Sequence, residues 1–150
     1  MAIGIKTETL KEIAEYLAMG MLCFYHKTNG EWVYFPDELE YSGLEEEWAD
    51  ETGKIEAAPD DYFEFEKMGS RESFKVMERF IGDNISHIPT HNKFIEAISR
   101  KKPFANFNHL ISYYPDLRQE WFAFKDQSYI EFVKDQLEAY NNMLEFDEDS

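Results

Sequence analysis

A β-hairpin signal near the start of the chain constrains its fold more than any other feature. Residues 21–27 and 31–35 are rich in apolar and aromatic side chains, and Asn29-Gly30 lies between them. Both turn residues tolerate positive backbone φ, which the tight turns of hairpins require. Pro36 then ends the second strand, because proline has no N–H to donate to a neighbouring strand. We therefore predict an antiparallel hairpin over residues 21–35.

The segment after the hairpin is less regular. Residues 37–50 hold a few apolar side chains among many carboxylates, which predicts a short acidic helix interrupted near Ser42-Gly43. Thr52-Gly53 predicts a turn. In residues 54–65, Phe63 and Phe65 alternate with acidic neighbours, and this period of two predicts a third strand or an extended segment on the hairpin.

Helical periodicity dominates the remaining sequence. The first helix is predicted over residues 9–18. Thr9 is its expected N-cap, and Glu12, three residues later, has the spacing of a capping box. Gly20 is expected to end this helix. Four further helices are expected, with their starts marked by Ser70, Thr90, Pro103 and Pro115. The last should reach about Tyr140, and the acidic tail at about 143–150 should fray. We predict a single α+β domain over residues 1–150: a small antiparallel sheet packed with a C-terminal bundle of about four helices.

The net charge of −16 is distributed unevenly. Residues 37–66 carry 13 acidic side chains and one basic side chain, whereas residues 67–135 carry 11 basic and 9 acidic ones. A field of this sign repels phosphate backbones, so nucleic acid is an unlikely partner overall. The acidic segment is either a solvated face or a docking surface for a basic partner.

Several features point to a cytoplasmic setting without a membrane span. The longest apolar-leaning run covers residues 16–25, and a helix needs roughly 20 residues to cross a bilayer. The first eleven residues lack the pattern of a secretory signal. The single cysteine, Cys23, lies inside the apolar run and is expected to be a buried, inert thiol.

No pattern for catalysis or for metal binding stands out. His87 and His91 have helical spacing for a metal, but Pro89 lies between them and no cysteine adds a ligand. Carboxylate runs such as Glu45-Glu46-Glu47 and Asp60-Asp61 are too common in this chain to indicate acid–base chemistry. We expect no metal and no cofactor, and the sequence favours a protein that is not an enzyme.

Two regions are candidate partner-binding surfaces. On the final helix, one stripe of apolar residues contains Trp121, and a second stripe, roughly 130° away, contains Phe122, Tyr129, Val133 and Tyr140. Such a helix is either buried on two sides or presents one stripe to a partner. The second region is basic, and it is either a solvated helix end or a contact for single-stranded nucleic acid by charge and stacking. It comprises Arg100, Lys101, Lys102, Phe104 and Phe107.

The order of these segments resembles a known family. The motifs that carry the resemblance are SRESF at 70–74, MERF at 77–80, FANF at 104–107 and LRQEWFAFKD at 117–126. Over roughly residues 8–142 the chain is similar to the bacterial group called uncharacterised protein family 0158. The resemblance implies a shared fold and a bacterial cytoplasmic setting, and it implies no activity. Similar sequences tend to be basic around Phe107, where this chain has Asn106 and Asn108, which weakens a nucleic-acid function.

Three functions follow in order of preference. The first is a non-catalytic interaction or regulatory module that binds a protein partner. The second is an adaptor that contacts nucleic acid through the Arg100–Phe107 region. The third is an enzyme with an unrecognised carboxylate site. The identity of the partner and the oligomeric state are left open by the sequence.

Overall fold

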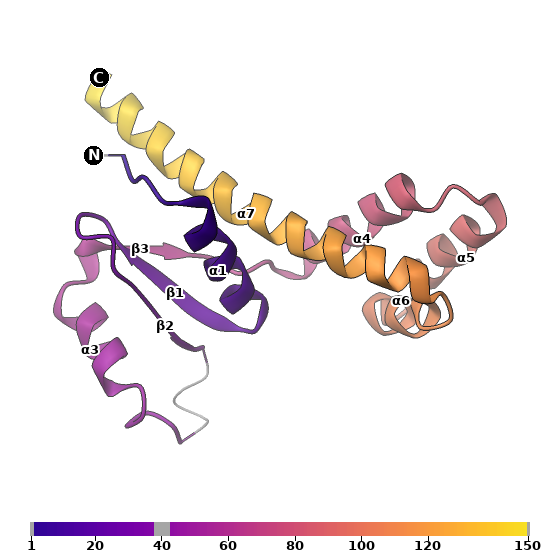
Figure 1. Cartoon of the computed structure of the whole chain (residues 1–150), viewed down its shortest axis with the longest axis horizontal. Coiled ribbons are helices and arrows are strands. Elements are labelled where there is room, and N and C mark those ends of the chain that lie inside the picture. Colours follow the sequence, from indigo (N-terminus) through magenta and orange to yellow (C-terminus); the bar gives the residue numbers. More distant parts are fainter. Residues whose placement is uncertain (1, 38–42, 150) are drawn as a thin grey trace. The chain divides into compact units, whose positions relative to one another are not determined.

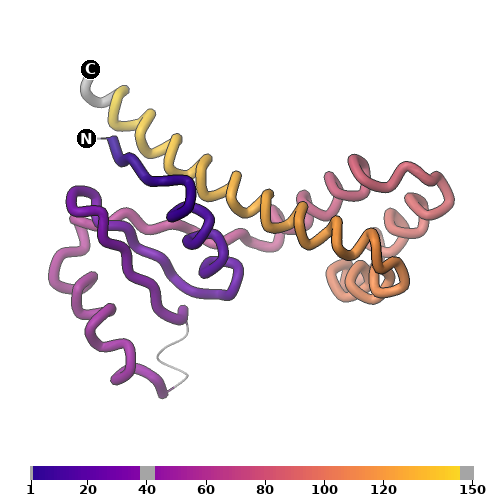
Figure 2. The backbone as a smooth tube through the Cα atoms, viewed as in Figure 1, coloured from indigo at the N-terminus to yellow at the C-terminus, as the bar shows by residue number. Residues whose placement is uncertain are grey.

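The computed structural model describes residues 2–37 and 43–149, with side chains up to Glu145, and has an α+β fold. Its contacts group the chain into two compact units. Unit 1 combines residues Met1–Lys67 with Tyr129–Ser150, and unit 2 is Met68–Ser128. In unit 1 the N-terminal segment runs beside the end of the last helix (Figure 2). The sequence predicts a single domain, and this stays a prediction. Denaturant unfolding tests it, because a single domain should unfold in one cooperative transition.

Unit 1 contains a three-stranded antiparallel sheet with the order β2-β1-β3. Its elements are α1 (Thr7–Ala18), β1 (Met21–His26), β2 (Trp32–Pro36), α3 (Ala49–Ala57), the short 3-10 helix η1 (Pro59–Asp61) and β3 (Tyr62–Phe65) (Figure 1). The hairpin and the third strand predicted from the sequence are confirmed. The central strand pairs Tyr25 with Trp32 on one side and with Phe63 on the other.

The hairpin loop is longer than a two-residue turn, and a histidine organises it. The Nδ1 atom of His26 accepts hydrogen bonds from the backbone N–H groups of Thr28 (3.2 Å) and Asn29 (3.1 Å). The Asn29 side chain in turn accepts from the Glu31 N–H at 2.9 Å. Gly30 has φ +77°, the left-handed conformation that the Asn-Gly signal predicts.

The core of unit 1 lies between the sheet and two helices. Cys23, Tyr25 and Phe65 point to one face of the sheet and are buried against α1 and the last helix, α7 (Pro115–Asp149). From α1 the contributors include Ile13 and Leu17, and from α7 they include Val133 and Leu137. On the other face of the sheet Val33 and Phe35 are also buried. The alternation along β1 and β2 therefore places apolar groups on both faces.

Two amide side chains of α7 form reciprocal pairs with backbone groups of unit 1. Asn141 accepts from the Ile3 N–H (2.8 Å) and donates to the Ile3 carbonyl (3.0 Å). Gln136 does the same with Glu66, at 2.7 Å and 2.9 Å. Each pair satisfies both polar groups of one residue, as a neighbouring strand would, and this fixes the N-terminal segment and the end of β3 to α7.

Three local predictions for unit 1 are wrong. Helix α1 begins at Thr7 after Lys6 as N-cap, so the Thr9 cap does not form. The predicted turn at Thr52-Gly53 lies inside α3, where the Thr52 hydroxyl donates to the Trp48 carbonyl at 3.1 Å and is satisfied within the helix. Residues 54–57 complete that helix and are not extended. The predicted helix over 37–50 falls partly outside the described residues, and helix begins only at Ala49.

Unit 2 is helical and has its own aromatic core. It consists of α4 (Ser70–Asn84), α5 (Ile88–Ile98), α6 (Pro103–Ile111) and the first part of α7. The ring of Phe107 lies 4.8 Å from that of Trp121 and 5.5 Å from that of Phe94. Phe80 lies 5.2 Å from Trp121. Such edge-to-face pairs add stability beyond the area they bury.

The helix starts in unit 2 differ slightly from those predicted. Gly69 is the N-cap of α4, and its N–H donates to the Glu72 carboxylate at 3.2 Å, so Ser70 is the first helical residue. In α5 the N-cap is His87, whose Nδ1 pairs with the Thr90 hydroxyl at 2.8 Å. Pro103 and Pro115 open their helices as expected. Helix α7 continues to Asp149 and does not end near Tyr140, and the fraying expected at about 143–150 stays a prediction.

Candidate partner-binding surface

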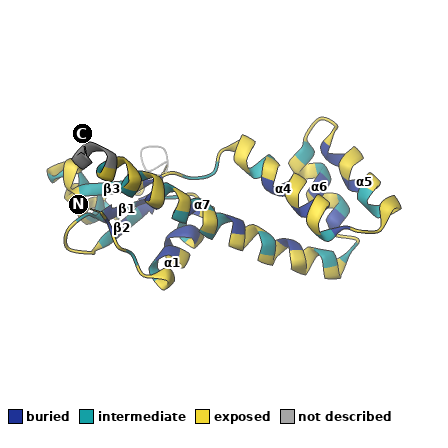
Figure 3. Cartoon of the chain, turned by 90° about the horizontal axis from the view of Figure 1, so that it is seen from above, coloured by how far each residue is buried: buried dark blue, intermediate teal, exposed yellow. Residues whose placement is uncertain are grey.

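Two adjacent aromatic residues on α7 have opposite environments. Trp121 is 6% exposed and belongs to the core of unit 2, whereas Phe122 is 42% exposed. Consecutive residues on a helix point about 100° apart, so one residue can face the core while the next faces solvent. Buried and exposed residues alternate in this way along α7 (Figure 3). An exposed phenylalanine at this position has no role in the core.

Two cations flank the exposed Phe122 ring. The Arg118 guanidinium carbon lies 5.0 Å from the ring centroid, and the Lys125 Nζ atom lies 5.4 Å from it. These residues are four before and three after Phe122, so all three share one face of the helix. We call Arg118, Phe122 and Lys125 the aromatic–cation surface. It offers an apolar ring for packing and two positive groups for carboxylates.

The other two aromatics of the predicted stripe are not exposed in the same way. Tyr129 and Tyr140 belong to unit 1, where both pack partly buried against its core. The Tyr140 ring lies 4.7 Å from Phe63, and the Lys27 Nζ atom lies 5.7 Å from the Tyr140 centroid. Val133, between them on the stripe, is fully buried. The stripe is therefore mostly core in unit 1, and Phe122 is its exposed member.

The basic region forms the loop between α5 and α6. Arg100, Lys101 and Lys102 are all exposed. The Asn106 amide donates to the carbonyls of Ala97 and Lys101, both at 2.9 Å, which holds the loop in place. Lys102 adopts the left-handed conformation with φ 60°.

The two phenylalanines of that region differ. Phe104 is 37% exposed, whereas Phe107 is 0% exposed and packs in the core. Phe107 therefore cannot stack on a nucleobase, and its assignment to a binding surface is corrected. The spacing of residues 104 and 107 places both on one side of the helix. The exposed fraction of each side chain depends on which other helices pack against that side.

A cluster of aromatic side chains in unit 1 was missed by the sequence analysis. Tyr16 of α1 stacks on Tyr34 of β2 at 4.0 Å, and Trp32 lies 5.7 Å from Tyr16. Trp48, just before α3, lies 6.1 Å from Tyr34. All four are partly exposed. The period of two that brings Trp32 and Tyr34 to one face of β2 was a visible signal for part of this cluster.

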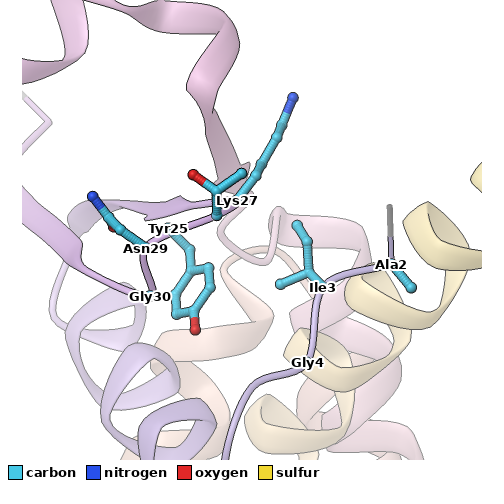
Figure 4. Close-up of a pocket in the computed structure, with 8 residues that line it drawn as sticks. Ala2, Ile3, Gly4, Tyr25, Lys27, Asn29 and Gly30 are labelled. Carbon is cyan, nitrogen blue, oxygen red and sulfur yellow. The ribbon is translucent and has the colours of Figure 1, made fainter.

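A pocket of about 400 Å³ lies between the hairpin loop and the N-terminal segment. Its lining includes Tyr25, Lys27, Ala2, Ile3 and Gly4 (Figure 4). The Lys27 ammonium donates to the Asp60 carbonyl at 2.8 Å. The described residues that line this pocket include no Asp or Glu side chain.

Clusters of metal-ligating side chains and membrane-spanning helices are both absent from the described part of the chain. Within residues 2–37 and 43–145, no group of three or more His, Cys, Asp or Glu side chains could hold a metal ion. His87 and His91 lie at the start of α5, with the His91 N–H donating to the His87 carbonyl. No helix in the described part of the chain is long and apolar enough to cross a membrane.

The surroundings of Glu64 in the folded protein disfavour the ionised form of its carboxyl group. Glu64 lies on β3 opposite Phe24, and partial desolvation of its otherwise exposed side chain raises its pKa, with further contributions from Glu66 and Asp37. A raised pKa means that the folded state holds the proton more tightly than the unfolded state does. The contribution of Glu64 to the free energy of unfolding therefore increases as pH falls through the raised pKa.

We expect Glu64→Gln to raise the free energy of unfolding at neutral pH. The gain should be small, because the side chain is exposed to solvent and its charge is screened. It should vanish in acidic buffer, where the parent Glu64 is itself protonated. Denaturant unfolding of both proteins at neutral and acidic pH measures this, and a variant less stable than the parent at neutral pH would contradict it.

Cys23 is expected to be unreactive in the native protein. It is fully buried, its Sγ lies 3.9 Å from the Ile13 carbonyl oxygen, and burial raises its pKa to about 12. The thiolate is the reactive form, so an aromatic disulfide reagent should leave the folded chain unmodified. Denaturant should expose one reactive thiol. Rapid labelling without denaturant would show that the sheet opens readily around β1.

The chain was compared with curated proteins, with solved structures and with protein families. No curated protein and no solved structure matches it. Residues 12–149 match a family described as Uncharacterised protein family (UPF0158). The match includes the aromatic–cation surface, the basic loop and most of both units, and it confirms the resemblance found in the sequence. The chain is a member of Uncharacterised protein family (UPF0158).

Proposed function

We propose that the protein is a non-catalytic interaction module that binds a protein partner through the aromatic–cation surface. The observation that carries this proposal is the exposed Phe122 between Arg118 and Lys125. Aromatic residues and arginine are enriched among the residues that dominate binding energy at interfaces. The partner segment that fits is an apolar side chain next to carboxylates.

The net charges of the two units support a binding site for an acidic partner segment on unit 2. Unit 2 has nine basic and seven acidic side chains, a net charge of +2, whereas unit 1 has 6 basic and 24 acidic ones, a net charge of −18. An acidic partner segment would thus be repelled by unit 1 and accepted by unit 2. We also propose a bacterial cytoplasmic setting, which the single cysteine and the family resemblance support.

Site-specific photo-crosslinking tests the function. A photoreactive phenylalanine analogue at position 122 should capture a partner in cells, and the same analogue at position 113 should not. Tyr113 is the matched control, because it is an aromatic residue of unit 2 and is 68% exposed. The captured protein is then purified and its affinity for the intact chain is measured.

The affinity should fall about tenfold or more with Phe122→Ala, the loss typical of a residue central to an interface. Met19→Ala, an exposed apolar residue of unit 1, should leave the affinity unchanged. Equal affinities for the parent and Phe122→Ala would exclude this surface as the binding site.

A nucleic-acid adaptor is the second candidate, and the ordered basic loop favours it. Arg100, Lys101 and Lys102 are exposed beside the partly exposed Phe104. Fluorescence anisotropy with a single-stranded oligonucleotide of about 16 nucleotides tests it across a salt series. Binding that weakens with salt and is lost when the three basic residues become Gln supports the adaptor. No binding at low salt would rule it out.

A further inference from the structure

The aromatic cluster of unit 1 has the composition of a cation-binding surface. We call Tyr16, Trp32, Tyr34 and Trp48 the ring cluster. Its rings come from three separate segments: α1, β2 and the residue before α3. The rings of Trp32 and Tyr34 lie 5.4 Å apart, and each of the four side chains keeps part of its surface in solvent. Faces of tryptophan and tyrosine rings carry partial negative charge and attract cations.

Each segment of the ring cluster also carries carboxylates close to its aromatic residues in the sequence. Glu12 and Glu15 lie within one helical turn of Tyr16, and both add to a raised Tyr16 pKa whose largest cause is the hydrogen bond with Tyr34. Glu31 and Glu47 directly precede Trp32 and Trp48 in the chain and are exposed. Each of the three segments that supply the rings therefore also carries a carboxylate next to a ring-cluster residue or within one helical turn of it.

We propose that the ring cluster and its bordering carboxylates bind an arginine-rich segment of a protein partner. A guanidinium group stacks on an aromatic face and pairs with a carboxylate through two parallel hydrogen bonds, so it uses both features at once. A lysine ammonium is a point charge and uses them less well. The net charge of −18 in unit 1 attracts a basic segment and excludes acidic ones. This surface is separate from the aromatic–cation surface of unit 2.

A labelled hexa-arginine peptide tests the proposal by fluorescence anisotropy with the full chain at physiological salt. Hexa-lysine should bind several-fold more weakly, and hexa-citrulline, which has the same shape without the charge, should bind at least about tenfold more weakly. Spermidine should fail to displace the arginine peptide at equal charge concentration. Equal binding of the citrulline peptide, or equally effective displacement by spermidine, would overturn the proposal.

Trp48→Leu separates ring recognition from general attraction to an acidic surface. Leucine keeps an apolar side chain at this partly exposed position but removes the aromatic face, so the affinity for hexa-arginine should fall about tenfold. Phe122→Leu removes an exposed ring of unit 2 and should leave the affinity unchanged. Unchanged affinity of Trp48→Leu, with its folding checked by circular dichroism, would overturn the role of the rings.

A matched pair of charge variants tests the carboxylates without changing the rings. Glu12→Gln with Glu15→Gln removes two charges beside Tyr16, and Glu138→Gln with Glu145→Gln removes two from exposed positions on α7. Only the first pair should weaken hexa-arginine binding by several-fold. Equal losses in both pairs would show that net charge alone attracts the peptide and would overturn a defined site.

Discussion

Trp121→Ala is expected to lower the free energy of unfolding by about 3–5 kcal/mol, the usual cost of truncating a buried large aromatic residue. The indole is buried in unit 2 and lies 4.8 Å from Phe107 and 5.2 Å from Phe80, ring centroid to ring centroid. Truncation removes these contacts and leaves a cavity that the surrounding helices can fill only in part. A loss of this size is a large share of the total stability of a small domain.

The neighbouring substitution Phe122→Ala provides the control. Its ring is exposed, so the loss should stay below about 1 kcal/mol. Denaturant unfolding of the two variants, followed by circular dichroism, measures both values. A loss of several kcal/mol in Phe122→Ala would place this ring in the core, and the aromatic–cation surface would then lose its basis.

Gly30→Val is expected to lower the free energy of unfolding by about 1–3 kcal/mol. Gly30 has φ +77°, a conformation that β-branched residues strongly disfavour. A Cβ atom there would lie 3.5 Å from the Tyr25 hydroxyl, which is an ordinary contact. The expected loss therefore comes from backbone strain in the hairpin loop and not from a steric clash.

Two further glycine variants distinguish backbone strain at Gly30 from other causes of a lower free energy of unfolding. Gly30→Asn should recover part of the stability, because asparagine adopts positive φ more readily than valine does. Gly53→Ala should raise the stability by up to about 1 kcal/mol, since Gly53 lies inside α3 and an added Cβ meets no atom within 4 Å. If Gly30→Val melts like the parent, the loop conformation is not the one described.

The sequence by itself determined the features that depend on neighbouring residues. Asn29-Gly30 marked the hairpin because few residues accept positive φ, and Pro103 and Pro115 marked helix starts because proline has no N–H to lose there. The alternation of Phe63 and Phe65 with glutamates marked β3. These signals act within a few residues and do not need the rest of the chain.

Tertiary structure decided which aromatic side chains are buried and which are exposed. Helical spacing showed that Trp121 and Phe122 point apart, but only the packing of α4 and α6 against α7 showed that the core lies on the Trp121 side. The same packing buried Phe107 and left Phe104 partly exposed. It also brought Tyr16, Tyr34 and Trp48 together from segments far apart in the chain. Periodicity gives the direction of a side chain relative to its own helix or strand, whereas burial depends on which other elements lie in that direction.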